Sequence, residues 1–222
     1  MSGGAEQTLR DGLRNLGLDL DDRQIAQLLA YLAMIGKWTQ VYNLTAVRDP
    51  AEMMTHHLLD SLAAVPPLTR QLKQMALERG ARLLDVGAGA GLPGVVIAIC
   101  CPTVAVTCVD TVAKKAAFIK QAELELKLTN LTGLHRRVEQ VTEPYDVICS
   151  RAFASLDDFT SWSARALAPG GVWMAMKGKH PTGEIDALDT VVEVFHVEQL
   201  TVPGLDAERC IVWMRPVAAS TI

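Results

Sequence analysis

The chain has no long hydrophobic run, no cysteine pair at metal-ligand spacing and no excess of positive charge. A membrane-spanning helix needs about 18–20 consecutive apolar residues, and no stretch of this sequence approaches that length. The N-terminal residues 1–6 also lack the basic and apolar regions of a secretory signal peptide. We therefore predict no membrane association and a cytoplasmic location.

The cysteines are five in number and include no C-x-x-C pair, which disfavours a zinc site. They lie in apolar segments that are predicted to be strands or helix ends. These residues are Cys100, Cys101, Cys108, Cys149 and Cys210. We predict that they are buried small hydrophobic side chains in a reducing compartment, and that the protein binds no metal.

The 222 residues, half of them apolar, are enough for one sizeable core or for a core domain with a helical extension. The first part of the chain is predicted to be helical, because apolar residues such as Ile25, Leu28 and Ile35 recur at helical spacing. Further helices are expected at residues 6–16, at 51–65, stopping at Pro66-Pro67, and at 69–78. The predicted boundary divides a helical extension at 1–80 from a second domain at 81–222.

After residue 80 the sequence alternates between strand and helix patterns. Strands are expected at 82–86, 104–109, 131–135, 145–150 and 172–176, and helices at 92–101, 111–127 and 156–168. Two late strands, 191–198 and 209–215, have no helix between them and are expected to form a terminal antiparallel hairpin. The pattern predicts a Rossmann-like, doubly wound α/β fold with a mostly parallel seven-stranded sheet.

Residues 83–94 contain the strongest motif of the chain. An apolar run is followed by Asp85 and then by glycines at alternate positions, Gly87, Gly89 and Gly91. That order is typical of a strand, a tight turn and a helix, which form a cofactor site at the carboxyl end of a strand. Glycine suits such a turn because it accepts positive φ and lets a ligand approach the backbone.

Two cofactors fit this motif. Residues 89–94 match the G-x-G-x-x-G dinucleotide fingerprint, and Asp110 follows at about the expected distance, which would suit a nicotinamide oxidoreductase. Asp85 favours S-adenosylmethionine instead, because a carboxylate pointing into the pocket would attract an ammonium and a sulfonium but repel a pyrophosphate. Asp110 is expected to accept hydrogen bonds from both ribose hydroxyls. Asp85, Gly87, Gly89 and Asp110 are therefore predicted cofactor residues.

The third predicted strand is followed by Arg136, Arg137, Val138 and Glu139, at the entrance to a short helix. In this fold that junction faces the adenine of the cofactor, so backbone groups of Val138 and Glu139 are candidates for contacts with the base edge. The alternative for Glu139 is a plain acidic residue at a helix start.

Several segments together carry a family resemblance. They read VYNLTA at 41–46, HHLLDS at 56–61, DVGAGAGLPG at 85–94, SRAFASL at 150–156 and MKG at 176–178. On these residues the chain resembles the class I S-adenosylmethionine-dependent methyltransferases. More closely, it resembles the bacterial 16S ribosomal RNA guanine-N7 methyltransferases of the glucose-inhibited division protein B family. The resemblance implies methylation of N7 of one guanine in small-subunit RNA, with S-adenosylhomocysteine as the product.

The resemblance also implies roles for individual residues. Matched by position, the cofactor contacts are Gly87, Leu92, Val138, Glu139 and Arg151, with Asp110 beside them. Arg137 and Arg209 match arginines of the family that are implicated in activity. We take Arg137, Arg151 and Arg209 as candidate catalytic residues.

The chemistry of guanine N7 requires little from the protein. N7 carries an exposed lone pair, so no proton has to be removed before in-line attack, and catalysis can consist mostly of proximity and orientation. The sequence agrees, since no Asn-Pro-Pro-Tyr-like motif, which would favour methylation of an exocyclic amino group, follows the fourth strand. Cys149 also lacks the neighbouring proline of the cytosine-C5 enzymes.

Basic residues gather at the carboxyl ends of the predicted strands. The net charge of −4 gives no indication of nucleic-acid binding by the whole molecule, but a local basic rim can still bind RNA. The rim is predicted to consist of Arg136, Arg137, Arg151, Lys177, Lys179 and His180. Arg151 is a candidate for stacking on or hydrogen-bonding to the target base, and Arg136, Lys177 and Lys179 for RNA contacts. Each of these residues taken singly can also be ordinary surface charge.

Three alternatives to an RNA methyltransferase stay open at this point. They are a methyltransferase acting on a small molecule or protein, a nicotinamide oxidoreductase, and a non-catalytic RNA-binding protein. The expected partner is 16S rRNA or the small ribosomal subunit, and the expected state is a monomer. His56 and His57 cannot share one helix face, and either RNA contact or a core role suits them.

Overall fold

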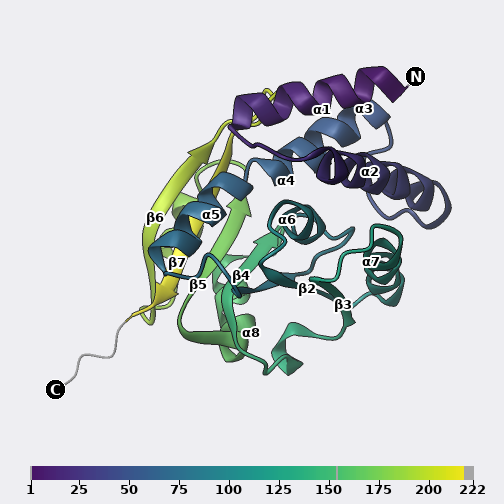
Figure 1. The fold of residues 1–222 in the computed structure, drawn as a ribbon. Coiled ribbons are helices and arrows are strands. Elements are labelled where there is room, and N and C mark those ends of the chain that lie inside the picture. The colour runs from purple at the N-terminus through teal and green to yellow at the C-terminus, as the bar shows by residue number, and fades with distance from the viewer. Residues whose placement is uncertain (1, 154, 218–222) are drawn as a thin grey trace.

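The computed structural model describes residues 2–153 and 155–217, and within them a single seven-stranded sheet is flanked by helices (Figure 1). The strand order is β3-β2-β1-β4-β5-β7-β6. The strands are β1 (Arg82–Val86), β2 (Ala105–Asp110), β3 (Leu131–His135), β4 (Tyr145–Arg151), β5 (Leu167–Lys177), β6 (Val192–Leu200) and β7 (Arg209–Pro216).

The five strands β1–β5 run parallel, whereas β7 is antiparallel to both β5 and β6. This arrangement confirms the predicted doubly wound sheet with a terminal hairpin. The chain leaves β1 for β2 and β3 on one side and returns to β4 on the other, so Val86 pairs with Ser150 at a topological switch point. In α/β sheets of this kind, ligands bind outside the carboxyl ends of the strands at such a point.

Helices cover both faces of the sheet. The α-helices are α1 (Ser2–Leu16), α2 (Asp22–Tyr42), α3 (Pro50–Met53), α4 (Asp60–Leu62), α5 (Val65–Gln74), α6 (Gly94–Cys100), α7 (Ala113–Glu125), α8 (Leu156–Ser163) and α9 (Thr182–Asp186). Short π- and 3₁₀-helical segments are η1 (Met54–Leu59), η2 (Val138–Gln140) and η3 (Ala164–Ala166). In the described part of the chain, no helix combines the length and the apolar character that crossing a bilayer requires.

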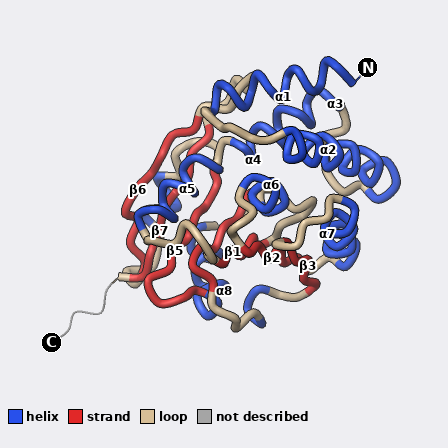
Figure 2. Tube along the Cα trace, in the orientation of Figure 1, coloured by secondary structure: helices blue, strands red, loops and turns tan. Residues whose placement is uncertain are grey.

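Alternation along the strands sends neighbouring side chains to opposite faces, and each face has its own hydrophobic cluster. Leu83 faces α6, α7 and the N-terminal helices, whereas Leu84 faces α8. Helices α1 to α6 lie on one side of the sheet, and α8 lies on the other (Figure 2).

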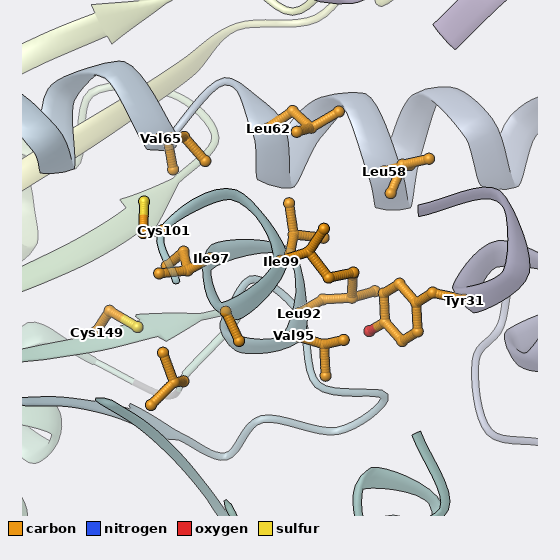
Figure 3. Close-up of a cluster of buried hydrophobic side chains, with 14 of the residues drawn as sticks. Tyr31, Leu58, Leu62, Val65, Leu92, Val95, Ile97, Ile99, Cys101 and Cys149 are labelled. Atoms are coloured by element: carbon orange, nitrogen blue, oxygen red, sulfur yellow. The ribbon is translucent and has the colours of Figure 1, made fainter. Parts of the chain in front are cut away.

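The N-terminal helices pack directly on α6. Figure 3 shows Leu58, Leu62 and Val65 above the helix that carries Ile97 and Ile99. All five side chains are buried in the same cluster, so residues before and after Gly80 share one core. The domain boundary near Gly80 stays a prediction.

Three local details differ from the sequence-based expectations. The helix expected at 51–65 breaks at Ala63-Ala64, and Pro66-Pro67 lie in the first turn of α5, where a fixed φ favours helix initiation. Strand β5 begins at Leu167 instead of residue 172, and its first part includes Gly170 at φ +76° and pairs with β4 across a register shift. Helix α9 was not expected.

The cysteines are free thiols, four of them buried and Cys100 half-buried. Burial raises the pKa of the Cys101 thiol to about 11 and that of the Cys108 thiol well above its usual value. These thiols therefore stay protonated at neutral pH and act as small apolar side chains, as predicted.

One buried hydroxyl links the N-terminal helices to the glycine motif. The Tyr31 hydroxyl on α2 donates toward the carbonyl oxygens of Ala90, at 2.5 Å, and Gly91, at 3.1 Å. We predict that Tyr31→Phe lowers the free energy of unfolding by about 1–2 kcal/mol, because two buried carbonyl groups lose a donor. Urea denaturation of the full chain measures the change.

The matched control is Tyr42→Phe on the same helix, where the side chain is half exposed. That variant is expected to unfold like the unsubstituted protein. Equal stability of both variants would show that the Tyr31 hydroxyl contributes nothing to the fold.

Candidate active site

The turn after β1 depends on glycine. Gly87, Gly89 and Gly91 all have positive φ, between +59° and +82°. A Cβ on Gly87 would lie 3.2 Å from the Phe153 ring, and one on Gly91 would lie 2.5 Å from Cγ2 of Val95. The positive φ therefore favours glycine at all three positions, as the motif predicted, and at Gly87 and Gly91 the close side chains add a steric restriction.

A first cavity opens beside this turn, at the carboxyl ends of β1, β2 and β3. Its volume is about 180 Å³. The lining residues are Val86, Gly87, Val109, Asp110, Thr111, Arg136, Arg137, Val138, Glu139, Phe153 and Trp162. Six residues that the sequence singled out thus come together here: Gly87, Asp110, Arg136, Arg137, Val138 and Glu139.

Asp110 fastens the glycine turn to the start of α7. Its Oδ2 accepts a hydrogen bond from the Gly89 amide at 2.9 Å, and its Oδ1 accepts one from the Val112 amide at 2.8 Å. The side chain is almost fully buried but lies on the cavity wall. A carboxylate has about four acceptor positions, so both oxygens retain capacity for a ligand hydroxyl.

Aromatic side chains that the sequence did not single out form another wall of the first cavity. Phe153 lies between Phe159, at 5.8 Å between ring centroids, and Trp162, at 5.6 Å in an edge-to-face arrangement. Phe153 belongs to the SRAFASL segment, but nothing in the sequence pattern marked Trp162 on α8. The wall offers a flat, apolar surface to a ring system.

Asp85 does not reach either cavity in this structure, and its contact with a cofactor stays a prediction. The carboxyl is fully buried beneath α6, where Oδ2 accepts the Gly94 amide at 2.8 Å, and Asp85 lines neither of the cavities described here. Its Oδ1 has no hydrogen-bond partner within residues 2–153 and 155–217. Burial raises the pKa of this carboxyl to about 7, against the opposing effects of the Gly94 amide and Arg151.

Two other predicted cofactor residues also lie outside the cavity linings. Leu92 is buried in the hydrophobic cluster, and Gly89 binds Asp110 through its amide. Their contact with a cofactor stays a prediction.

A second cavity, which we call the arginine cavity, lies at the carboxyl ends of β4 and β5. Its volume is about 420 Å³. The lining residues are Val47, His56, His57, Asp60, Arg151, Ala152, Met176, Lys177, Gly178 and Arg209. The linings of the two cavities are consecutive in the chain at one point, since Ala152 lines the arginine cavity and Phe153 lines the first cavity.

Asp60 joins the two candidate catalytic arginines of this cavity. Nη1 of Arg151 donates to Asp60 Oδ2 at 2.9 Å and to the His56 carbonyl at 2.8 Å. Nε of Arg209 donates to Asp60 Oδ1 at 2.8 Å. Asp60 belongs to the HHLLDS segment, which was noted only as part of a resemblance, so sequence reasoning missed its role.

Both histidines of that segment line the arginine cavity. The His56 carbonyl accepts a hydrogen bond from Arg151, and the His57 ring is buried. Burial and the nearby Arg151 lower the pKa of His57 to about 4, so the ring is neutral at physiological pH. Neither ring nitrogen has a hydrogen-bond partner among the described residues.

The predicted basic rim is only partly a free positive surface. Lys177 lines the arginine cavity, but its Nζ lies 2.7 Å and 3.0 Å from the carboxylate oxygens of Glu184. Glu184 Oε2 also accepts the Leu156 amide at 2.8 Å, which ties α9 to the start of α8. Lys179 is exposed and lines neither cavity.

The sheet order, the glycine turn and the position of the cavities define a class I S-adenosylmethionine-dependent methyltransferase fold. Solved structures agree on the fold. Magnesium protoporphyrin IX methyltransferase (ChlM) from Synechocystis PCC 6803 with bound SAM superposes with a TM-score of 0.58 at 14% identity, covering 89% of this chain and 98% of that one. TrmN from Thermus thermophilus superposes with a TM-score of 0.55 at 19% identity, covering 74% and 53%.

Sequence comparisons narrow the class to one family. The family model described as rRNA small subunit methyltransferase G matches residues 24–212. Ribosomal RNA small subunit methyltransferase G of Polaromonas naphthalenivorans (strain CJ2) is 76% identical over 211 residues, covering 95% of this chain and 96% of the relative. The protein of the same name from Acidovorax sp. (strain JS42) is 67% identical over 217 residues, covering 96% of each. The chain belongs to the rRNA small subunit methyltransferase G family, which confirms the resemblance.

The raised pKa of Asp85 has a consequence for stability. The folded state holds this proton more tightly than the unfolded chain, so its contribution is complete at low pH and is lost as pH rises toward about 7. Asp85→Asn keeps an oxygen for the Gly94 amide but cannot titrate. Between about pH 4 and 7, ionisation of Asp85 in the unfolded state is expected to lower the unfolding free energy of the unsubstituted chain by up to about 1.4 kcal/mol per pH unit. We predict that the Asp85→Asn variant does not show this decrease.

Denaturant unfolding of both proteins across that range measures the difference, with the exposed Asp19→Asn as the control. Parallel stability curves for the Asp85 variant and the unsubstituted chain would contradict the assignment.

Proposed function

We propose that this protein transfers a methyl group from S-adenosylmethionine to N7 of a guanine in the 16S RNA of the small ribosomal subunit. The observation that carries the proposal is a pair of cavities at the carboxyl ends of the parallel strands, one walled by Asp110 and aromatic rings and the other by Arg151 and Arg209. It supports a cofactor in the first cavity and a nucleobase in the arginine cavity. Since the expected substrate is ribosomal RNA, we expect the protein to act in the cytoplasm, as a monomer.

The residues of the first cavity fit S-adenosylmethionine, which supplies a methyl group on a sulfonium when bound. Asp110 has acceptor capacity at the cavity wall for a ribose diol, and Gly87 leaves the backbone uncovered beside it. Phe153 and Trp162 provide a flat apolar wall for adenine, with Val138 and Glu139 at its edge.

The residues of the arginine cavity suit a base that needs orientation rather than deprotonation. Arg151 and Arg209 are held by Asp60 in fixed directions, and the neutral His57 ring lies beside them. Arg137, at the first cavity, is the third arginine for which we propose a catalytic role. Arg136, Lys177 and Lys179 are proposed RNA contacts around the two cavities.

The alternatives explain less. A methyltransferase for a small molecule or protein leaves the paired guanidinium groups of the arginine cavity without a purpose. A non-catalytic RNA-binding protein leaves the first cavity without one. The oxidoreductase alternative is excluded by family membership, since the Asp85 argument against it does not hold in the folded chain.

The test is methyl transfer from labelled S-adenosylmethionine to small-subunit RNA, and to whole subunits, from a strain that lacks this protein. The products are digested and the modified nucleoside is identified by mass spectrometry. We predict label in 7-methylguanosine. We also expect Arg151→Lys to lower kcat/KM about 10–100-fold, because lysine keeps the charge but loses the bidentate fork.

Arg165→Lys is the matched control, since Arg165 is exposed and lies in neither cavity lining. Absence of label from both RNA substrates, with cofactor binding intact, would refute the RNA assignment.

Cofactor binding gives a separate prediction. Asp110→Asn keeps the shape of the side chain but removes its charge and one acceptor, so we expect about 10-fold weaker binding of S-adenosylhomocysteine. Isothermal titration calorimetry of the full chain measures the Kd, with Asp19→Asn as an exposed control. An unchanged Kd for the Asp110 variant would remove Asp110 from the cofactor site.

A further inference from the structure

The arginine cavity has an unequal supply of hydrogen-bonding groups. Each carboxylate oxygen of Asp60 accepts a hydrogen bond from one arginine, and the side chain is almost fully buried, so little of it is open to a ligand. Nη1 of Arg151 and both Nε and Nη1 of Arg209 also have partners, whereas no bond within the described residues involves Nη2 of either arginine. A guanidinium group has five N–H donors and no acceptor, so what the arginines offer to a ligand is donors.

The arginines are also restricted in orientation and partly desolvated. Their side chains are 21% and 24% exposed, and Asp60 is 4% exposed. The group of two guanidinium cations and one carboxylate carries a net positive charge, and the Lys177 charge beside it is matched by Glu184. A ligand without an acceptor at this position would leave partly buried donors unpaired, which is costly.

Purine bases differ at the atom that meets such donors. During methylation at N7 that nitrogen must face the methyl group, and the substituent on C6 is its neighbour on the same edge. Guanine has the acceptor O6 there, whereas adenine has an amino group that is itself a donor. Arginine donors therefore attract guanine and reject adenine at this edge.

We propose that the arginine cavity selects its target base through the C6 oxygen, and that Asp60 is the positioning residue that aims Arg151 and Arg209 at this atom. The proposal rests on the proposed methyl transfer to guanine N7 and adds the group that is recognised. In the proposed site Asp60 touches neither the cofactor nor a reacting atom, and it affects the reaction only by orienting the two arginines.

The first test varies the base and leaves the protein unchanged. The methylated guanine is first located by mass spectrometry of ribonuclease fragments of the labelled RNA. It is then replaced by inosine, 2-aminopurine or adenine in RNA joined by ligation, and kcat and KM for methylation are measured. Inosine keeps O6 but lacks the 2-amino group, whereas 2-aminopurine keeps N7 and the 2-amino group but lacks O6. We expect inosine to be methylated within about 10-fold of guanine, and 2-aminopurine and adenine at least about 100-fold less efficiently.

Equal methylation of guanine and 2-aminopurine would overturn the proposal, as would rejection of inosine together with acceptance of 2-aminopurine. Failure of the unsubstituted guanine RNA to accept a methyl group would instead refute the proposed function itself. The two failures are therefore distinguishable.

The second test addresses Asp60. Asp60→Asn is expected to lower kcat/KM for guanine RNA about 10–100-fold and to shrink the ratio between guanine and 2-aminopurine, with the Kd of S-adenosylhomocysteine within about 2-fold of the original. Asp19→Asn is the exposed control. A purely structural role would lower the active fraction equally for both bases, so an unchanged ratio would overturn the positioning role.

Discussion

The carboxylate of Asp60 holds together three parts of the chain that are distant in sequence. It comes from the N-terminal helices and binds Arg151 at the end of β4 and Arg209 at the start of β7, which are 91 and 149 residues away. Taking three charges out of water is costly, and buried ion pairs rarely add net stability over apolar packing. What the arrangement does provide is a fixed direction for two guanidinium groups, which apolar side chains could not supply. In the proposed reaction, this fixed direction would serve the bound base rather than the stability of the fold.

The helices that precede the sheet are part of the site. Tyr31 of α2 binds the carbonyl groups of the glycine turn, and Val47, His57 and Asp60 line the arginine cavity. The π-helical segment η1 lies directly before Asp60, and such segments are frequent at functional positions because they shift the side chains that follow. Residues before Gly80 therefore support the glycine turn beside the first cavity and line the arginine cavity, whichever way the chain is divided into domains.

Local patterns were enough to predict most of the fold and the first cavity. The alternating strand pattern of β1, the spaced glycines and Asp110 are close together in the sequence. Residues that are close in sequence stay close in the fold, so this part of the site could be predicted without knowledge of long-range contacts. The burial of Asp85 could also have been expected from the strand pattern. Side chains alternate along β1, so Val86 faces the first cavity while Asp85 turns to the opposite face, beneath α6. The role of Asp60 could not be predicted from local patterns, because Arg151 and Arg209 are distant in sequence and approach it only in the folded chain.

The basic rim also shows what cannot be predicted from local sequence patterns. Counting cations at strand ends predicted that Lys177 would be free for RNA, but Glu184 from α9, a helix that was not expected, pairs with it. Charge available to a polyanion depends on such partners and not on the number of lysines and arginines, which is why a chain of net charge −4 can still present a positive cavity.

A single backbone turn sets the relation between the two cavities. Ala152 has φ +58°, a left-handed conformation that costs energy for a residue with a Cβ and that persists only where the surroundings enforce it. It lies between Arg151 in the arginine cavity and Phe153 in the first cavity, so the side chains on its two sides diverge into different sites. In-line transfer requires donor and acceptor atoms to meet at a fixed distance and angle. In the proposed reaction the strand end at Arg151 and the residue after it would set this relation, with no need for a group that exchanges protons.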